Sequence, residues 1–161
     1  MDAIEIKNVE RSDSVFLCQL MNDSKIMKAL NESPTSQEDW AEAVNYWEND
    51  DDELDFIIWN DGKQIGWFAF NGLQSLDKTV YLKMAVILPQ YQNKGIGTYV
   101  LFQLLEVMKK KGFVKIALFT NQENINAQRC YQRCGFRIIE ELTQKMSDNT
   151  LAARYKMECN L

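Results

Sequence analysis

Histidine is absent from the 161-residue sequence, which also has only two prolines and seven glycines. Without histidine the chain has no serine–histidine or cysteine–histidine catalytic pair, and it has neither of the common histidine-based zinc-hydrolase sites. Any chemistry must therefore use carboxylates, tyrosine, thiols, backbone amides or a cofactor, and we expect no metal site. The small number of prolines and glycines argues against a disordered or low-complexity chain.

Long apolar runs are also missing, since none approaches the roughly 18 residues of a membrane span. Residues 1–5 are acidic and alternating, which is atypical of a secretory signal. The net charge of −5 argues against a nucleic-acid binder and leaves room for a cationic partner. We therefore expect a cytoplasmic protein, with residues 1–161 forming a single domain that binds neither nucleic acid nor membranes.

The four cysteines are Cys18, Cys130, Cys134 and Cys159, and no two of them form a Cys-x-x-Cys pair. Cys130 and Cys134 lie one helical turn apart in an amphipathic segment. Cysteine behaves as a small apolar residue in protein cores, so the pattern predicts buried free thiols.

The hydrophobic pattern predicts the element order β-α-α-β-β-β-α-β-α-β-β. Ser36 is a typical cap for a helix that carries Trp40 and Trp47 on one face, and Asp61-Gly62 between apolar runs indicates a hairpin. The order is that of a mixed α/β sheet with helices on both faces. The expected strands are residues 4–8, 54–59, 64–70, 79–88, 114–120, 136–140 and 154–158, and the expected helices follow Asp13, Ser36 and Gly97 and cover residues 126–134.

The glycine-containing segment Gln-Asn-Lys-Gly-Ile-Gly, residues 92–97, lies between a strand and a helix. Free N–H groups at a helix N-terminus bind anions, and Gly95 and Gly97 let the backbone approach a ligand. Lys94 adds a cation, so the segment is suited to a pyrophosphate; a plain strand-to-helix turn is the alternative. The segment does not have the spacing of a Walker loop. It does not match a dinucleotide-binding loop either, because Val100 stands where that motif has its third glycine.

Residues 89–97, Pro-Gln-Tyr-Gln-Asn-Lys-Gly-Ile-Gly, resemble the central signature of the GNAT superfamily of N-acetyltransferases. A second segment, Asn-Ile-Asn-Ala-Gln-Arg-Cys-Tyr-Gln-Arg-Cys-Gly-Phe at residues 124–136, resembles that family's Asn-x-x-Ala-x-x-x-Tyr-x-x-x-Gly-Phe element. Because a chance match to the second element alone is on the order of one in ten thousand chains, the combination is specific. The resemblance implies a mostly antiparallel sheet of about six to seven strands flanked by about four helices.

The resemblance also implies direct transfer of an acetyl group from acetyl-CoA to a primary amine in a ternary complex, and it suggests a homodimer. Tyr131 matches the family's general acid, which protonates the departing thiolate; the alternative is a half-buried helix tyrosine beside Phe136. The family's two parallel strands splay to admit the pantetheine arm. The residues expected to bind acetyl-CoA are Val86, Ile87, Leu88, Gln92, Asn93, Lys94, Gly95, Ile96, Gly97, Thr98, Asn124 and Tyr131.

No base is assigned to take the proton from the amine. The strand at residues 79–88 carries no carboxylate, and its only charged side chain is Lys83. Glu123 is either an acid near the active region or a solvated loop carboxylate. A chain of water molecules to bulk solvent is the remaining route.

In the family, the first two helices and the hairpin build the acceptor site. Trp40 and Trp47 have the spacing of core residues. The acidic run at residues 48–55, which begins at Glu48 and ends at Asp55, is typical of a solvated loop, and if it faced the acceptor cleft it would attract a cation. We expect a small cationic amine as acceptor. A non-catalytic acetyl-CoA sensor or partner-binding module on the same fold is the alternative.

Overall fold

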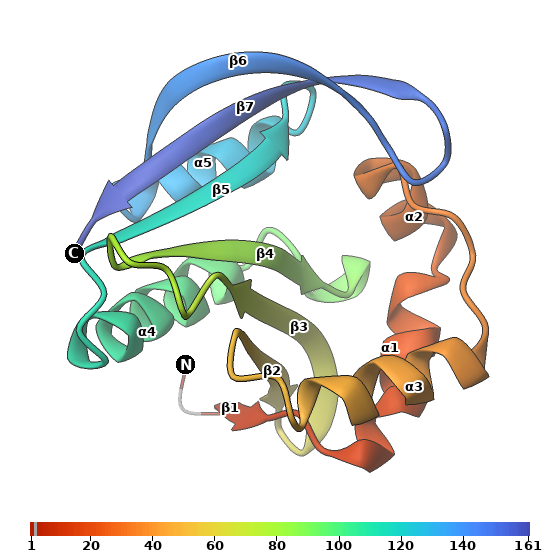
Figure 1. The fold of residues 1–161 in the computed structure, drawn as a ribbon. Helices are drawn as coiled ribbons and strands as arrows, with labels where there is room; N and C mark the ends of the chain where they lie inside the picture. Colours follow the sequence, from red (N-terminus) through yellow and green to blue (C-terminus); the bar gives the residue numbers. More distant parts are fainter. Residues whose placement is uncertain (2) are drawn as a thin grey trace.

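The computed structural model describes residue 1 and residues 3–161; Asp2, part of the N-terminal segment considered above, lies outside the described residues. The described part forms one seven-stranded sheet in the order β1-β2-β3-β4-β5-β7-β6 and five α-helices (Figure 1), which confirms the expected mixed fold. The strands are β1 (Ile4–Asn8), β2 (Glu53–Asn60), β3 (Lys63–Asn71), β4 (Thr79–Ile87), β5 (Lys115–Asn121), β6 (Arg137–Lys145) and β7 (Leu151–Asn160). The helices are α1 (Ser14–Met21), α2 (Ser24–Leu30), α3 (Gln37–Trp47), α4 (Ile96–Lys110) and α5 (Ile125–Arg133). None of the helices in these described residues is long and apolar enough to cross a membrane.

The sheet consists of two antiparallel halves that meet at one parallel pair. Strands β1 to β4 form a meander, and β7 lies between β5 and β6. The parallel register between β4 and β5 covers only residues 79–81 of β4, which face residues 115–117 of β5. Beyond this short ladder the two strands diverge (Figure 1). The last part of β4 is therefore splayed from β5, as the family resemblance implies.

Local sequence signals account for the best-defined turns and helix ends. Asp61 and Gly62 have φ angles of 50° and 74°, as expected for a two-residue hairpin turn between β2 and β3. Ser36 caps α3 by accepting a hydrogen bond from the Asp39 amide at 3.1 Å. These elements confirm the predicted hairpin and the predicted second helix.

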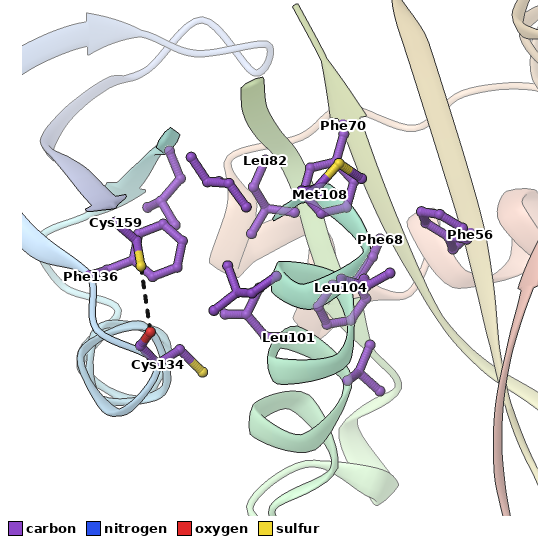
Figure 2. Close-up of a cluster of buried hydrophobic side chains, with 14 of the residues drawn as sticks. Phe56, Phe68, Phe70, Leu82, Leu101, Leu104, Met108, Cys134, Phe136 and Cys159 are labelled. Carbon is purple, nitrogen blue, oxygen red and sulfur yellow. Dashed lines mark hydrogen bonds between the residues drawn. The ribbon is translucent and has the colours of Figure 1, made fainter. Parts of the chain in front are cut away.

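Alternating side chains of the strands form one apolar cluster on each face of the sheet. Phe56, Ile58 and Phe70 pack on the face covered by α4 and α5, and Figure 2 shows their neighbours Leu101, Leu104 and Met108 on α4. Ile57 and Trp67 point to the opposite face, which α1, α2 and α3 cover. The period of two in the strands therefore places the hydrophobic residues in both layers of the core. The residues of the first cluster labelled in Figure 2 are Phe56, Phe68, Phe70, Leu82, Leu101, Leu104, Met108, Cys134, Phe136 and Cys159.

Three elements differ from the sequence prediction. Helix α2 was not predicted, because only Ile26 of its seven residues is buried and no apolar stripe marks it. Strands β6 and β7 are longer than expected, since β6 is exposed along almost its whole length and shows no apolar alternation. Asp13 precedes α1 but makes no capping bond; its carboxylate accepts hydrogen bonds from the Glu10 amide and Gln64 Nε2, both at 2.7 Å.

Candidate active site

A cavity of about 520 Å³ opens between α2, the end of β4, the first turn of α4 and α5. The charged side chains in its lining are Lys25, Arg129 and Arg133, and all three are cationic. A concave site with only positive charges attracts an anionic ligand even though the whole chain is negative. The cavity therefore fits a polyanion better than a cation.

The first turn of α4 forms one wall of this cavity. Gly95 lies at the N-cap position with a φ of +80°, in the left-handed region that glycine adopts without strain. Gly95, Gly97 and Thr98 all line the cavity, so the free N–H groups at the start of a 15-residue helix lie at its wall. The Gln92 side chain donates a 2.8 Å hydrogen bond to the Ile87 carbonyl and ties this turn to the end of β4. Such a helix N-terminus is suited to phosphate groups.

The structure brings nine of the twelve residues expected to bind acetyl-CoA to the cavity lining. The other three, Leu88, Lys94 and Ile96, do not line the cavity. Leu88 packs against the α1–α3 cluster, Ile96 is buried in the α4 cluster, and the Lys94 ammonium lies 5.8 Å from the centre of the Tyr91 ring. The nine residues in the lining are Val86, Ile87, Gln92, Asn93, Gly95, Gly97, Thr98, Asn124 and Tyr131.

Tyr131 lies on α5 at the edge of the same cavity. Its ring packs 5.8 Å from that of Phe136, so both roles considered for this tyrosine, packing and catalysis, are compatible with its position. Burial raises the pKa of Tyr131 above its ordinary value of about 10, while the nearby positive charge of Arg154 opposes the shift. The phenol is therefore protonated at neutral pH and can donate a proton.

Asn124 starts α5 and also lines the cavity. Its side-chain oxygen accepts a 3.3 Å hydrogen bond from the Ala127 amide, which is an N-cap interaction. The oxygen is thus used within the helix, and the side-chain NH₂ group is the part that can donate to a ligand.

Asn31, directly after α2, joins that helix to the β5–β7–β6 half of the sheet beside the cavity. Its carboxamide oxygen accepts a 2.7 Å hydrogen bond from Asn121 at the end of β5, and its NH₂ group donates to Thr150 Oγ1 at 3.1 Å. The Asp148 amide donates to the Asn31 carbonyl at 3.1 Å. Figure 1 shows the β6–β7 hairpin reaching down to α2, where these contacts form. The cavity is therefore bordered on this side by a hydrogen-bonded bridge.

A buried carboxylate was not recognised from the sequence. The sequence pattern predicts that Asp55 belongs to a solvated acidic run, but it lies in β2, is only 6% exposed and accepts a 2.8 Å hydrogen bond from the Trp67 indole. Burial, and next the adjacent Glu53 carboxylate, raise the pKa of Asp55 to about 8. The signal that could have located it is the alternation of the strand, which places Asp55 on the same face as Ile57.

A smaller cavity of about 200 Å³ lies on the α3 side of β4. Trp40 and Trp67 form part of its lining, together with the carboxylate residues Glu32 and Asp39. The ring centres of Trp40 and Trp47 each lie 5.6 Å from that of Trp67. Both tryptophans thus pack as their spacing predicted, and Trp40 in addition faces a cavity whose charged side chains are acidic.

A splayed sheet with a helix N-terminus and a buried tyrosine on one cavity is the arrangement that the sequence resemblance implies for an acyltransferase that uses acetyl-CoA. Residues 16–136 match the model of the acetyltransferase (GNAT) family. The chain therefore belongs to the GNAT family, and its activity class is acetyl-CoA-dependent N-acetyltransferase.

Individual relatives agree with this assignment. The chain is 24% identical over 155 residues to the spermidine N(1)-acetyltransferase of Escherichia coli (strain K12), covering 91% of this chain and 80% of that protein. It is 30% identical over 141 residues to N-alpha-acetyltransferase 30 of Schizosaccharomyces pombe, covering 86% and 87%. The crystal structure of spermidine N-acetyltransferase from Vibrio cholerae in complex with CoA and spermine superposes with a TM-score of 0.89 at 23% identity, over 99% of this chain and 96% of that one. The last comparison shows a shared fold.

Proposed function

We propose that this chain acetylates a primary amine of a small cationic acceptor by direct attack on acetyl-CoA in a ternary complex. The observation that carries the proposal is that the first turn of α4 and the protonated Tyr131 line one cavity. The E. coli and V. cholerae relatives, which by name act on spermidine, support a polycationic amine as acceptor.

The residues of the larger cavity fit acetyl-CoA. The α4 N-terminus at Gly95, Gly97 and Thr98 would hold the pyrophosphate, and Arg129 and Arg133 would balance its negative charge. Leu88, Lys94 and Ile96 would contribute backbone groups of the same turn and strand. Residues 86–88 would pair with the pantetheine arm, because the ladder to β5 ends well before them. When bound, acetyl-CoA supplies the thioester that the amine attacks.

Tyr131 is the proposed proton donor to the thiolate that leaves. Burial keeps the phenol protonated at neutral pH, as a proton donor must be, although the same raised pKa makes it a weaker acid than an ordinary tyrosine. Among the described residues, the larger cavity has no carboxylate in its lining, so water is the proposed acceptor of the amine's proton.

The smaller cavity is the proposed location of a distant ammonium group of the acceptor. Glu32 and Asp39 supply negative charge, and the faces of Trp40 and Trp67 attract cations. The arrangement separates the two substrates by charge, with the polyanion on the α4 side and the polycation on the α3 side of β4.

The test is an acceptor panel with detection of free CoA, combined with the Tyr131→Phe variant. We expect turnover on spermidine to exceed turnover on peptides with a free N-terminus. Tyr131→Phe should lower kcat about 10²- to 10³-fold while the calorimetric affinity for acetyl-CoA stays the same, because general acid catalysis contributes about this factor. Tight acetyl-CoA binding without turnover on any amine would instead identify a sensor or partner-binding module.

The acceptor side has its own test. Glu32→Gln combined with Asp39→Asn should raise the KM for spermidine about tenfold with little change in the KM for acetyl-CoA. Glu42→Gln is the matched control, since Glu42 is an exposed carboxylate on α3 outside the smaller cavity. An equal effect of both changes would reject this cavity as an ammonium site.

Direct attack also has to be separated from transfer through an acyl-cysteine. Cys130 lines the larger cavity and is the one cysteine that could carry the acetyl group there, so it is the residue to test. We expect Cys130→Ala to keep kcat within about threefold, and intact-protein mass spectrometry after mixing with acetyl-CoA alone to show no acetylated species. A stable acetyl adduct on Cys130 that an amine discharges would overturn direct transfer.

A further inference from the structure

Cys130 occupies a position that the proposed acetyl transfer does not use. It lines the larger cavity from α5, and its sulfur accepts a 3.4 Å hydrogen bond from Thr98 Oγ1 in the first turn of α4. A Cβ atom built on Gly97 would lie 3.8 Å from the same sulfur. The thiol therefore lies against the positive end of a 15-residue helix and faces an open cavity.

The surroundings of Cys130 favour its thiolate. The neighbouring Cys134 side chain contributes most; burial opposes it, and the Thr98 hydroxyl and the charge of Arg133 add to it, so that the pKa of Cys130 is lowered to about 6. Cys134 is the buried partner of this pair: its thiol donates to the Thr98 carbonyl at 3.8 Å, and its pKa is raised by the neighbouring Cys130 and by burial. The two thiols thus divide into an accessible, acidic one and a buried, protonated one.

The other cysteines lack this combination of access and charge. Cys134 and Cys159 are each only 6% exposed, and Figure 2 shows both within the α4-side cluster. Cys18 is half-buried like Cys130, but it lies on α1, outside both cavities, and its thiol donates to the Thr35 carbonyl at 3.7 Å. Among the four, Cys130 alone shares its cavity with three cationic side chains.

We propose that Cys130 is a site of reversible thiolation by small anionic disulfides, and that the attached group blocks the acetyl-CoA cavity. The Cys130 thiolate attacks one sulfur of the disulfide, and a new bond forms between Cys130 Sγ and that sulfur. The original S–S bond breaks, and the second sulfur leaves as a thiolate that takes a proton from water. One disulfide is consumed and one is formed, so the disulfide itself is the oxidant. Excess thiol reverses the exchange by the same steps.

The preference of Cys130 for anionic disulfides is expected to come more from the charge of the cavity than from the acidity of the thiol. At pH 7 a thiol of pKa about 6 has roughly 30-fold more thiolate than an ordinary cysteine, but its weaker nucleophilicity cancels about tenfold of that advantage. The remaining factor of about three is modest. The cationic lining should add about tenfold for an anionic disulfide over a cationic one at low salt, and this preference should fall as salt is added.

The test uses the reduced full-length chain with oxidised glutathione as the anionic disulfide and cystamine as the cationic one. Intact-protein mass spectrometry and peptide mapping follow the adduct in the absence of acetyl-CoA, so the result does not depend on the proposed function. We expect one glutathionyl group on Cys130, none on Cys130→Ser, and unchanged labelling of Cys18→Ser as the matched control. Acetyl-CoA at saturation should slow the labelling at least tenfold.

Binding of acetyl-CoA to the modified protein completes the experiment. Calorimetry should show at least a tenfold loss of affinity after thiolation, and dithiothreitol should restore it. Equal labelling of wild type and Cys130→Ser, or unchanged affinity of the thiolated protein, would overturn the proposal. Equal rates of labelling by oxidised glutathione and by cystamine would overturn the proposed preference of the cavity for anionic disulfides. Peptide mapping on the wild type keeps the site assignment independent of how well Cys130→Ser folds.

Discussion

Asp55 should make the stability of this protein depend on pH in a way that one substitution removes. Its carboxyl is buried between the Trp67 indole and Glu53, and its Oδ2 atom has no hydrogen-bond partner among the described residues. A proton on Oδ2 that is donated to Glu53 satisfies this atom. The pKa of about 8 means that the folded state carries this proton up to about pH 8, whereas the unfolded chain loses it near pH 4.

The sign and size of the effect follow from proton linkage. Between about pH 4 and pH 8 the folded state holds one proton more than the unfolded state at Asp55, so the free energy of unfolding falls as pH rises. The slope is at most about 1.4 kcal/mol per pH unit, which gives on the order of 3 kcal/mol between pH 5 and pH 7.5. Cys130 acts in the opposite direction above pH 6, because its lowered pKa favours the folded state there.

The Asp55→Asn variant isolates this contribution. Asparagine can still accept from Trp67, and its NH₂ group can donate to Glu53, so both contacts survive without a titrating proton. Urea unfolding followed by tryptophan fluorescence should give nearly equal stability close to pH 4, and a variant that becomes progressively more stable than wild type as the pH rises to 7.5. The effect of Cys130 cancels in this difference. Asp55→Ala, which leaves the indole N–H unpaired, should be less stable at both pH values by about 1–3 kcal/mol. Parallel pH curves for wild type and Asp55→Asn would refute the reasoning.

Three further predictions concern the cavity and the acidic run. Gly95→Ala should cost on the order of 1 kcal/mol in urea unfolding and weaken acetyl-CoA binding in calorimetry, because alanine is strained at a φ of +80°; unchanged binding would contradict a role for this turn. Asn124→Ala should lose about 1 kcal/mol of stability along with its cap, whereas Asn124→Asp should keep the cap and lose acetyl-CoA affinity through charge repulsion. Asp50→Asn combined with Asp51→Asn should leave the acceptor KM within about twofold, since neither residue lines a cavity, and a large salt-dependent rise in KM would reveal electrostatic steering instead.

The sequence predicts those parts of the fold that are determined by a few neighbouring residues, such as turns and helix caps. Asp61 and Gly62 adopt left-handed φ angles that few residues tolerate, and Ser36 supplies a capping oxygen at the right spacing. Helix α2 and the outer halves of β6 and β7 lack such causes. Ile26 is the single buried residue of α2, and contacts with distant segments hold that helix and the hairpin in place.

The same distinction applies to the site. The segment at residues 92–97 and the downstream Tyr131 could be predicted to lie together because each holds a fixed position in a motif, and both lie at the larger cavity. The environments of Asp55 and Cys130 could not be predicted in this way. The raised pKa of Asp55 depends on burial and then on Glu53, and the lowered pKa of Cys130 depends on Cys134 and, across the cavity wall, on Thr98 from another helix. Tertiary packing sets both.

The two halves of the sheet are linked in two separate places. One is the three-residue parallel ladder at the start of β4; the other is α2, which packs on the first half and is held to Asn121 and Thr150 of the second half by the hydrogen bonds of Asn31. Hydrogen bonds therefore join the two sides in two places rather than along a continuous ladder, while the cluster under α4 and α5 packs beneath both halves. We expect loss of the Asn31 hydrogen bonds to let α2 move away from the second half, so that a side chain outside the cavity lining would affect how readily a large ligand enters and leaves.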